Sequence, residues 1–140
     1  MSKFAQDLET GDTLAPLSFT VTPEWNQQYC YAQEDFDPRY TDSSADTPAE
    51  VHPTLLLSMS ANTKSPSFIL APDTGSILGE QLCQFFHPAR VGKRLDVAFR
   101  ITDIHTRQDK RFHVVESTVT DEDGVLILRR ESHLIFGRAK

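Results

Sequence analysis

The sequence has only two cysteines, Cys30 and Cys83, and they are far apart. Neither lies near a second cysteine or a Cys/His cluster with the spacing of metal ligands, so the sequence predicts no disulfide and no metal site. We expect both to be reduced, buried residues that pack as small apolar side chains. Long apolar runs are also lacking, and none approaches the roughly 20 residues that a membrane span needs. A soluble protein without a membrane partner is therefore predicted.

The sequence has fewer basic than acidic residues. The 140 residues carry 14 Lys and Arg against 20 Asp and Glu, which gives a formal net charge of -6. Because there is no positive surplus to neutralise phosphates, generic nucleic-acid binding is disfavoured. The opening segment MSKFAQDLETGD has no apolar stretch of the secretory type, which predicts a cytoplasmic protein. No repeat, low-complexity tract or linker divides the sequence, so a single domain over residues 1–140 is expected.

The first half of the chain has helical character. Leu17–Val21 alternates apolar and hydroxyl side chains and predicts a strand. A helix is expected directly after it, because Thr22 is a good N-cap and Pro23 in the first turn needs no amide partner. This helix should end near Glu34, ahead of a turn-forming segment.

A second helix is predicted to begin at Pro53 and to cover residues 53–64, PTLLLSMSANTK. Its apolar side chains point almost all round the helix; they are Leu55, Leu56, Leu57, Met59 and Ala61. A helix of this kind needs burial on most sides. We therefore expect it to lie at the centre of the fold.

From residue 76 onward the sequence shows the long alternation typical of strands. Strands are predicted over about residues 77–86, 95–101, 111–120 and 125–136. Asp123-Gly124, between the last two, is a strong signal for a tight hairpin. Together with the apolar helix, these strands predict an α+β domain in which a curved antiparallel sheet wraps around the helix. The opposite face or an edge of the sheet would be left for a second subunit.

Three stretches carry a resemblance to a known family. They are residues 22–42, which include DFDPRYTD; VHPTLLL at 51–57; and residues 85–137, from FFHPARVGKRLDV to VTDEDGVLILRRESHLIFG. Over about Leu17 to Gly137 the sequence resembles the MaoC-like branch of the hotdog fold. The closest subtype is the one found as the dehydratase region of fungal fatty acid synthases and as one subunit of the mycobacterial heterodimeric dehydratases.

The resemblance implies a dimeric hotdog fold. It implies an enoyl-thioester hydratase or 3-hydroxyacyl-thioester dehydratase that acts on acyl-CoA or acyl-carrier-protein substrates and uses no cofactor. The partner subunit would be a second copy or a related hotdog chain.

The family's catalytic motif D-x-N-P-x-H is similar to DFDPRY at residues 35–40. The resemblance places the catalytic carboxylate at Asp35, puts Asp37 where Asn is usual, and puts Tyr40 where the catalytic histidine is expected. Tyrosine at that position is associated with the subtype whose members often serve as the non-catalytic half of a heterodimer. Near neutral pH a tyrosine cannot replace histidine as a base, although it can still donate a hydrogen bond or act as an acid.

Hydration of an enoyl thioester needs a base that activates water, an acid that protonates the α-carbon, and donors for the enolate-like oxygen. Asp35 is the candidate base; alternatively, Asp35 and Asp37 are turn residues that only bond backbone amides. His52 is the candidate for the missing imidazole, or else a helix-boundary histidine without a partner. Tyr40 is a candidate donor, or a half-buried residue bonded to a backbone carbonyl.

The resemblance also suggests substrate contacts. In hotdog enzymes the start of the central helix, here Pro53, points at the thioester carbonyl, so the amides of Thr54 and Leu55 would form the oxyanion site. In the basic turn, Arg90 and Lys93 could contact the phosphates of coenzyme A or of a carrier arm, or simply be solvated. The remaining histidines are expected to be structural or exposed; they are His87, His105, His113 and His133.

Three functions remain open at this stage. The first is a hydratase or dehydratase with Asp35, Tyr40 and His52 as its catalytic residues. The second is a non-catalytic acyl-binding subunit whose partner carries the intact motif. The third and least favoured is a hotdog thioesterase in which Asp35 directs water at the thioester carbonyl.

Overall fold

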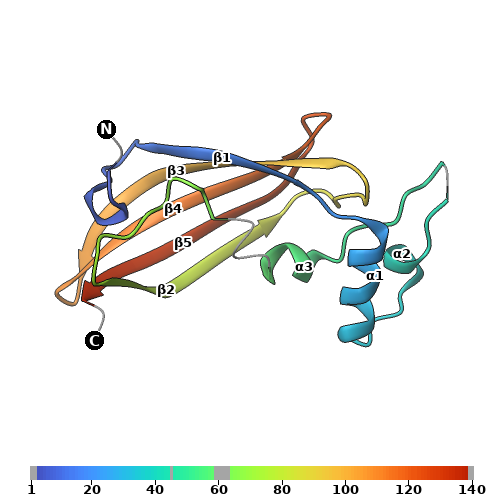
Figure 1. Cartoon of the computed structure of the whole chain (residues 1–140), viewed down its shortest axis with the longest axis horizontal. Coiled ribbons are helices and arrows are strands. Elements are labelled where there is room, and N and C mark those ends of the chain that lie inside the picture. The colour runs from blue at the N-terminus through green and yellow to red at the C-terminus, as the bar shows by residue number, and fades with distance from the viewer. Residues whose placement is uncertain (1–2, 45, 59–63, 139–140) are drawn as a thin grey trace.

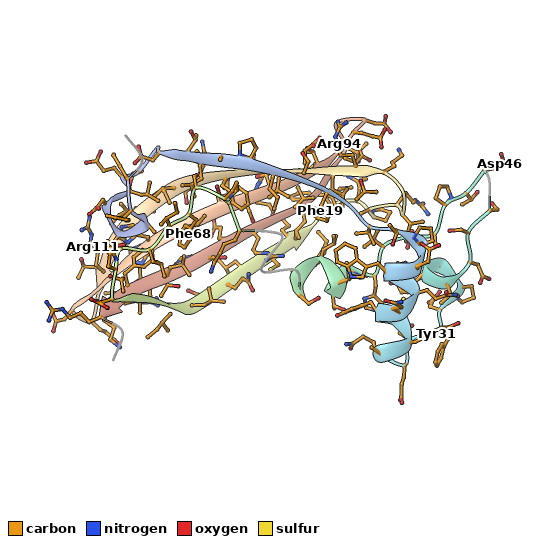
Figure 2. All side chains as sticks on the ribbon, viewed as in Figure 1. Phe19, Tyr31, Asp46, Phe68, Arg94 and Arg111 are labelled. Carbon is orange, nitrogen blue, oxygen red and sulfur yellow. The ribbon has the colours of Figure 1, made fainter. Side chains whose placement is uncertain are left out.

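A long antiparallel sheet with the α-helices gathered at one end dominates the computed structural model, which describes residues 3–44, 46–58 and 64–138 (Figure 1). In chain order the elements are η1 (Ala5–Asp7), β1 (Thr13–Thr20), α1 (Pro23–Ala32), α2 (Pro38–Thr41), α3 (Pro53–Ser58), β2 (Thr74–Phe85), β3 (Arg94–Arg107), β4 (Lys110–Asp121) and β5 (Leu126–Arg138). Figure 2 shows Tyr31 at the helical end of the molecule and Arg111 at the opposite end of the sheet.

The five strands are ordered β1-β3-β4-β5-β2, and all neighbours are antiparallel. The predicted strands are all found. β3 is much longer than predicted, because a register shift between Ile101 and Asp103 interrupts its alternation. β3 and β4 are joined through Gln108 and Asp109, both with positive φ. The predicted turn at Asp123-Gly124 joins β4 to β5.

The core lies against one face of the sheet. Leu95, Val97, Phe99 and Ile101 of β3 are each at most 5% exposed, as their alternation predicted. They belong to one buried cluster with Leu55 of α3. Each fully buried side chain of this size stabilises the fold by about 1.5–3 kcal/mol. The helical end is therefore anchored to the sheet through its apolar side chains.

α1 begins as predicted. Thr22 is the N-cap, and its hydroxyl oxygen accepts a hydrogen bond of 3.1 Å from the N–H of Trp25. Pro23 lies in the first turn, where its missing N–H costs nothing. The helix ends at Ala32, and Glu34 follows with a left-handed backbone (φ 53°).

α3 covers Pro53–Ser58 and lies at the end of the sheet beside α1 (Figure 1). Leu55 and Leu56 are buried. Met59 and Ala61, on which the prediction of a longer helix also depended, lie outside the described residues. The sheet is curved, but its enclosure of a central helix stays a prediction. No helix in the described part of the chain combines the length and apolar character that a membrane crossing needs.

The two cysteines differ in their surroundings. Cys30 on α1 is fully buried, as predicted, whereas Cys83 on β2 is exposed. The prediction of a buried Cys83 was wrong because β2 is an edge strand, with β5 on only one side. Its residues from Ile77 to Phe85 are exposed on both faces.

Candidate functional site

Asp35 is held at the exit of α1 by a hydrogen-bonded helix ending. Its N–H donates to the carbonyl of Cys30 at 2.9 Å, and the N–H of Glu34 donates to the carbonyl of Tyr31 at 3.1 Å. These two bonds form a Schellman motif, with Glu34 at the left-handed position that glycine usually fills. The carboxylate that the sequence suggested as a base is therefore fixed to the end of a helix.

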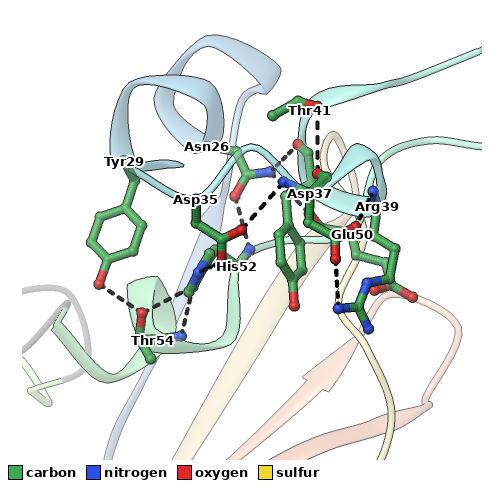
Figure 3. Close-up of polar contacts among 10 residues, drawn as sticks. Asn26, Tyr29, Asp35, Asp37, Arg39, Thr41, Glu50, His52 and Thr54 are labelled. Atoms are coloured by element: carbon green, nitrogen blue, oxygen red, sulfur yellow. Dashed lines mark hydrogen bonds and ion pairs between the residues drawn. The ribbon is translucent and has the colours of Figure 1, made fainter. Parts of the chain in front are cut away.

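The side chains of Asp35 and His52 meet. Asp35 Oδ2 lies 2.9 Å from His52 Nε2, so the two groups are hydrogen-bonded (Figure 3). The side chain of His52 is only 10% exposed, while that of Asp35 is 40% exposed. The pair thus has a buried imidazole and a carboxylate that water can reach.

The surroundings of His52 determine which ring nitrogen carries the proton. Nδ1 lies 3.3 Å from the backbone N–H of Thr54, which can only donate, and 2.9 Å from the Thr54 hydroxyl oxygen. Nδ1 is therefore an acceptor, and the proton of the neutral ring lies on Nε2, facing Asp35. The hydroxyl of Tyr29 lies 2.8 Å from Thr54 Oγ1 and extends the chain of polar groups (Figure 3).

The two aspartates of the motif have different roles. Asp37 caps α2, since its Oδ1 accepts the N–H of Arg39 and its Oδ2 binds the Arg39 guanidinium at 2.8 Å. These bonds lower the pKa of Asp37. Asp35 also accepts a backbone N–H, that of Asp37 at 3.2 Å, but through Oδ1 alone. Its second oxygen is the one that meets His52.

Tyr40 lies next to His52. Their ring centroids are 4.7 Å apart with an interplanar angle of 43°. The ring of Tyr29 also contacts His52, at 5.4 Å and in an edge-on arrangement. An imidazole therefore lies beside position 40, although position 40 itself carries a tyrosine.

A cavity of about 480 Å³ opens beside this group. Tyr40, Pro53 and Thr54 line its side nearest the Asp35–His52 pair, and its apolar wall includes Phe85 and Ile127. Its volume is within the range of small-ligand sites, roughly 300–1,000 Å³. Asp35 and His52 do not line the cavity themselves, but Tyr40 and Thr54, which both contact His52, do.

A second cavity, of about 250 Å³, lies over the sheet between Phe68, Phe99 and Leu134. Arg130 also lines it, and its guanidinium donates to the carbonyl of Leu56 at 2.7 Å. None of the residues predicted to act on or bind substrate lines this cavity. Of these two cavities, the first is the one lined by predicted site residues.

The predicted oxyanion donors are already engaged. The N–H of Leu55 donates to the carbonyl of His52 at 3.0 Å, and the N–H of Thr54 faces His52 Nδ1. Leu55 is also only 1% exposed, so its side chain packs in the core. In this conformation both amides are hydrogen-bonded within the first turn of α3. They are therefore not available to form the predicted oxyanion site. Pro53 and Thr54 do line the cavity.

The two predicted phosphate contacts have partners within the chain. Arg90 donates to the carbonyl of Pro48 at 3.2 Å and lies 3.7 Å from the carboxylate of Glu50. Lys93 forms an ion pair with Asp123, which raises the pKa of the lysine. A ligand phosphate would have to compete with these carboxylates.

A sequence model of the family described as "FAS1-like, dehydratase domain region" matches residues 9–130. The chain belongs to this dehydratase family. The family suspected from the sequence is thereby confirmed, and the match covers Asp35, Tyr40 and His52. No curated protein sequence matches the chain.

Solved structures of related proteins agree with the dehydratase family. The (R)-hydratase from A. caviae involved in PHA biosynthesis is 25% identical, with a TM-score of 0.72 over 93% of this chain and 98% of that chain. The MaoC-like dehydratase from Rhodospirillum rubrum is 18% identical, with a TM-score of 0.73 over 99% of each chain. The HadBC (3R-hydroxyacyl-ACP dehydratase) complex from Mycobacterium tuberculosis is 16% identical, with a TM-score of 0.65 over 98% of this chain and 100% of that chain. The hotdog fold and the hydratase or dehydratase class predicted from the sequence are supported.

Two residues of the candidate dehydratase site were not predicted from the sequence. The Tyr29 hydroxyl contacts Thr54 Oγ1, and the buried amide of Asn26 contacts the backbone of His52. The helical spacing marked Tyr29 as part of a packed face, which gave no sign of a polar role. An asparagine in the first turn of a helix carries no signal of a contact that is 26 residues away in the chain.

Proposed function

We propose that this chain catalyses the reversible addition of water to an enoyl thioester, with Asp35 as acid and base and His52 as its hydrogen-bonded partner. The observation that carries the proposal is the 2.9 Å hydrogen bond between Asp35 Oδ2 and His52 Nε2 beside the 480 Å³ cavity. A carboxylate and an imidazole in contact are the groups that proton transfer to and from a substrate requires. The substituted motif then keeps both functional groups, but the imidazole comes from a different segment.

In the hydration direction, Asp35 is the base. Its carboxylate removes a proton from water, whose oxygen forms the new bond to the β-carbon while the electron pair of the double bond moves toward the thioester. The carboxylic acid so formed, held by His52 Nε2–H, then delivers this proton to the α-carbon. This restores the carboxylate, while the ring of His52 keeps its proton on Nε2 and donates across the 2.9 Å bond throughout. Dehydration follows the same steps in reverse.

The negative charge that develops on the thioester oxygen needs a donor. The amides of Thr54 and Leu55 are engaged, so we assign this role to the hydroxyl of Tyr40, which lines the cavity. A tyrosine hydroxyl carries one O–H donor and is suited to donate to an oxyanion. The replacement of the motif histidine by Tyr40 then supplies a donor.

The substrate class is an acyl-CoA or acyl-carrier-protein thioester. Phe85 and Ile127 give the cavity an apolar wall that fits an acyl chain. The proposed chemistry uses only side chains and requires no cofactor. Within the described residues, no group of three or more His, Cys, Asp or Glu is arranged to hold a metal ion.

We further propose that a second copy of the chain pairs along β2. This strand lies at the sheet edge and exposes Ile77, Leu78, Leu82 and Phe85, by 67%, 51%, 51% and 44%. An apolar strand edge invites pairing with another chain, and its burial is favourable. Phe85 also lines the cavity, so a partner on this edge would close the substrate site.

A non-catalytic role is the second candidate, and Tyr40 is the observation that favours it. In that case a related hotdog subunit with the full motif performs the chemistry, and this chain holds the acyl group. HadBC from M. tuberculosis, a 3R-hydroxyacyl-ACP dehydratase, is likewise a complex. Native mass measurement and an activity assay of the purified chain together separate the catalytic from the non-catalytic role. A homodimer with turnover of its own excludes the non-catalytic role.

The proposed activity is tested by incubating the purified chain with a short enoyl-CoA and following loss of the absorbance of the conjugated thioester. We expect steady loss of the absorbance with no release of free thiol. Release of thiol would instead indicate thioester hydrolysis. No change over a series of chain lengths, on coenzyme A and on a carrier protein, would contradict the proposal.

A further inference from the structure

Asn26 of α1 is a polar residue with no exposed surface. Its Nδ2 donates to the carbonyls of Tyr40 and Glu50, both at 2.9 Å. Its Oδ1 accepts the backbone N–H of His52, also at 2.9 Å. The buried amide therefore uses both donor hydrogens and its oxygen, and it leaves no polar atom without a partner.

These three bonds join the segments that make up the site. Asn26 lies in the helix whose end carries Asp35, while its partners lie at Tyr40 and in the segment of Glu50 and His52 (Figure 3). All three partners are main-chain groups, so the bonds fix the path of the backbone whatever side chains stand there. The position of the His52 backbone is thereby set relative to α1.

We infer that Asn26 is a positioning residue for the Asp35–His52 pair. Asn26 contacts neither the Asp35 carboxylate nor the His52 ring. It holds the backbone of His52 against α1, the helix that Asp35 follows. The kinetic part of this inference rests on the proposed function, whereas the geometric part can be measured without turnover.

The amide group is the feature that the position requires. An aspartate of the same shape would place an oxygen against the carbonyl oxygens of Tyr40 and Glu50, and these would repel it. An apolar side chain would leave two carbonyls and one N–H buried without partners. In either case the chain segment that carries His52 would move. A displacement of about 1 Å at a reacting group can reduce a rate by about 100-fold.

The test compares Asn26→Ser with Cys30→Ala. Cys30 is also fully buried on α1, one turn later, so its truncation disturbs the same helix without touching the three bonds. For Asn26→Ser we expect kcat for enoyl-CoA hydration to fall about 10- to 100-fold while KM stays within about twofold. The NMR signals of the His52 ring should also shift. Cys30→Ala should keep both the kinetics and the His52 signals while losing stability.

A folded Asn26→Ser variant with wild-type kcat and unshifted His52 signals would overturn the inference. So would a Cys30→Ala variant that loses as much kcat as Asn26→Ser. If Asn26→Ser does not fold, amide hydrogen exchange of the wild type decides: the His52 N–H should be among the slowest to exchange, and rapid exchange would overturn the inference. If the His52 signals shift in Asn26→Ser but the wild type itself is inactive, the shift supports the positioning role of Asn26. The missing activity then contradicts the proposed function.

Discussion

His52 Nε2 lies 2.9 Å from Asp35 Oδ2, so a histidine that precedes α3 and a carboxylate that follows α1 share one hydrogen bond across 17 residues of sequence. In the motif that the sequence resembles, the two groups stand on one short loop. Here Tyr40 fills the usual histidine position, and its ring packs against that of His52. The imidazole beside Asp35 thus comes from a later segment of the chain than in the motif.

The carboxylate of Asp35 has a matched control elsewhere in the chain. Asp103 contacts His105 at 3.0 Å on β3, where it pairs with Val114 of β4. Asp35→Asn should reduce kcat by about 10²- to 10⁴-fold, because an amide cannot take a proton from water. Asp103→Asn should leave kcat unchanged. Initial rates with a short enoyl-CoA measure both, and equal rates for the two variants would refute the role of Asp35.

The left-handed backbone of Glu34 costs stability that a glycine would not lose. Glu34→Gly should raise the free energy of unfolding by about 1 kcal/mol, because a side chain at φ 53° is strained. Gln33→Gly is the control: Gln33 has φ -89°, so glycine there should only destabilise. Urea denaturation gives both values. A loss of stability in Glu34→Gly would mean that the helix ending does not hold Asp35 as described.

Buried His113 should make the fold sensitive to acid. It is 3% exposed against Phe136, and neither ring nitrogen has a hydrogen-bond partner among the described residues. Burial lowers the pKa of His113, and Arg111 lowers it further, while the backbone of Gln6 partly offsets the effect. Below about pH 6.5 the unfolded chain therefore binds a proton that the folded chain does not.

His113 thus contributes stability above about pH 6.5 that is lost as the pH falls through its lowered folded pKa. The free energy of unfolding of the wild type, measured in urea, should be smaller at pH 5.5 than at pH 7.5. His113→Leu should show a smaller difference between the two pH values. An identical pH dependence in the variant would show that other groups account for the effect.

The β2 edge predicts the oligomeric state. Leu82→Lys places a charge on the exposed edge strand and should convert a dimer to a monomer, since the ammonium would be buried in the interface. Val125→Lys is the control, because Val125 is also exposed (37%) but lies in the turn before β5. Native mass spectrometry distinguishes the two. A monomeric wild type, or a dimeric Leu82→Lys variant, would contradict pairing along β2.

Local signals predicted much of this fold. The Thr22 cap, the hairpin at Asp123-Gly124 and the buried face of β3 each depend on residues close together in sequence, so their patterns could be read directly. The carboxylate of Asp35 and the imidazole of His52 were both predicted as site residues, but their contact was not. It depends on the path of the chain between α1 and α3.

The features that the sequence did not reveal are tertiary contacts. Asn26 acts through main-chain groups 14 to 26 residues away, which leave no pattern in the sequence. The amides of Thr54 and Leu55 were expected to be available, and their capture by the side chain and carbonyl of His52 could be seen only in the structure. Exposed Cys83 likewise follows from the edge position of β2.

The most direct test of the Asp35–His52 pair is the initial rate of enoyl-CoA hydration by His52→Gln beside the wild type. Glutamine retains an N–H donor for Asp35, but its flexible side chain cannot hold the carboxylate in place as the buried ring does. With the fold intact by circular dichroism, we expect the rate to fall about 10- to 100-fold. A rate within about twofold of the wild type would contradict the assignment of His52 to the catalytic pair.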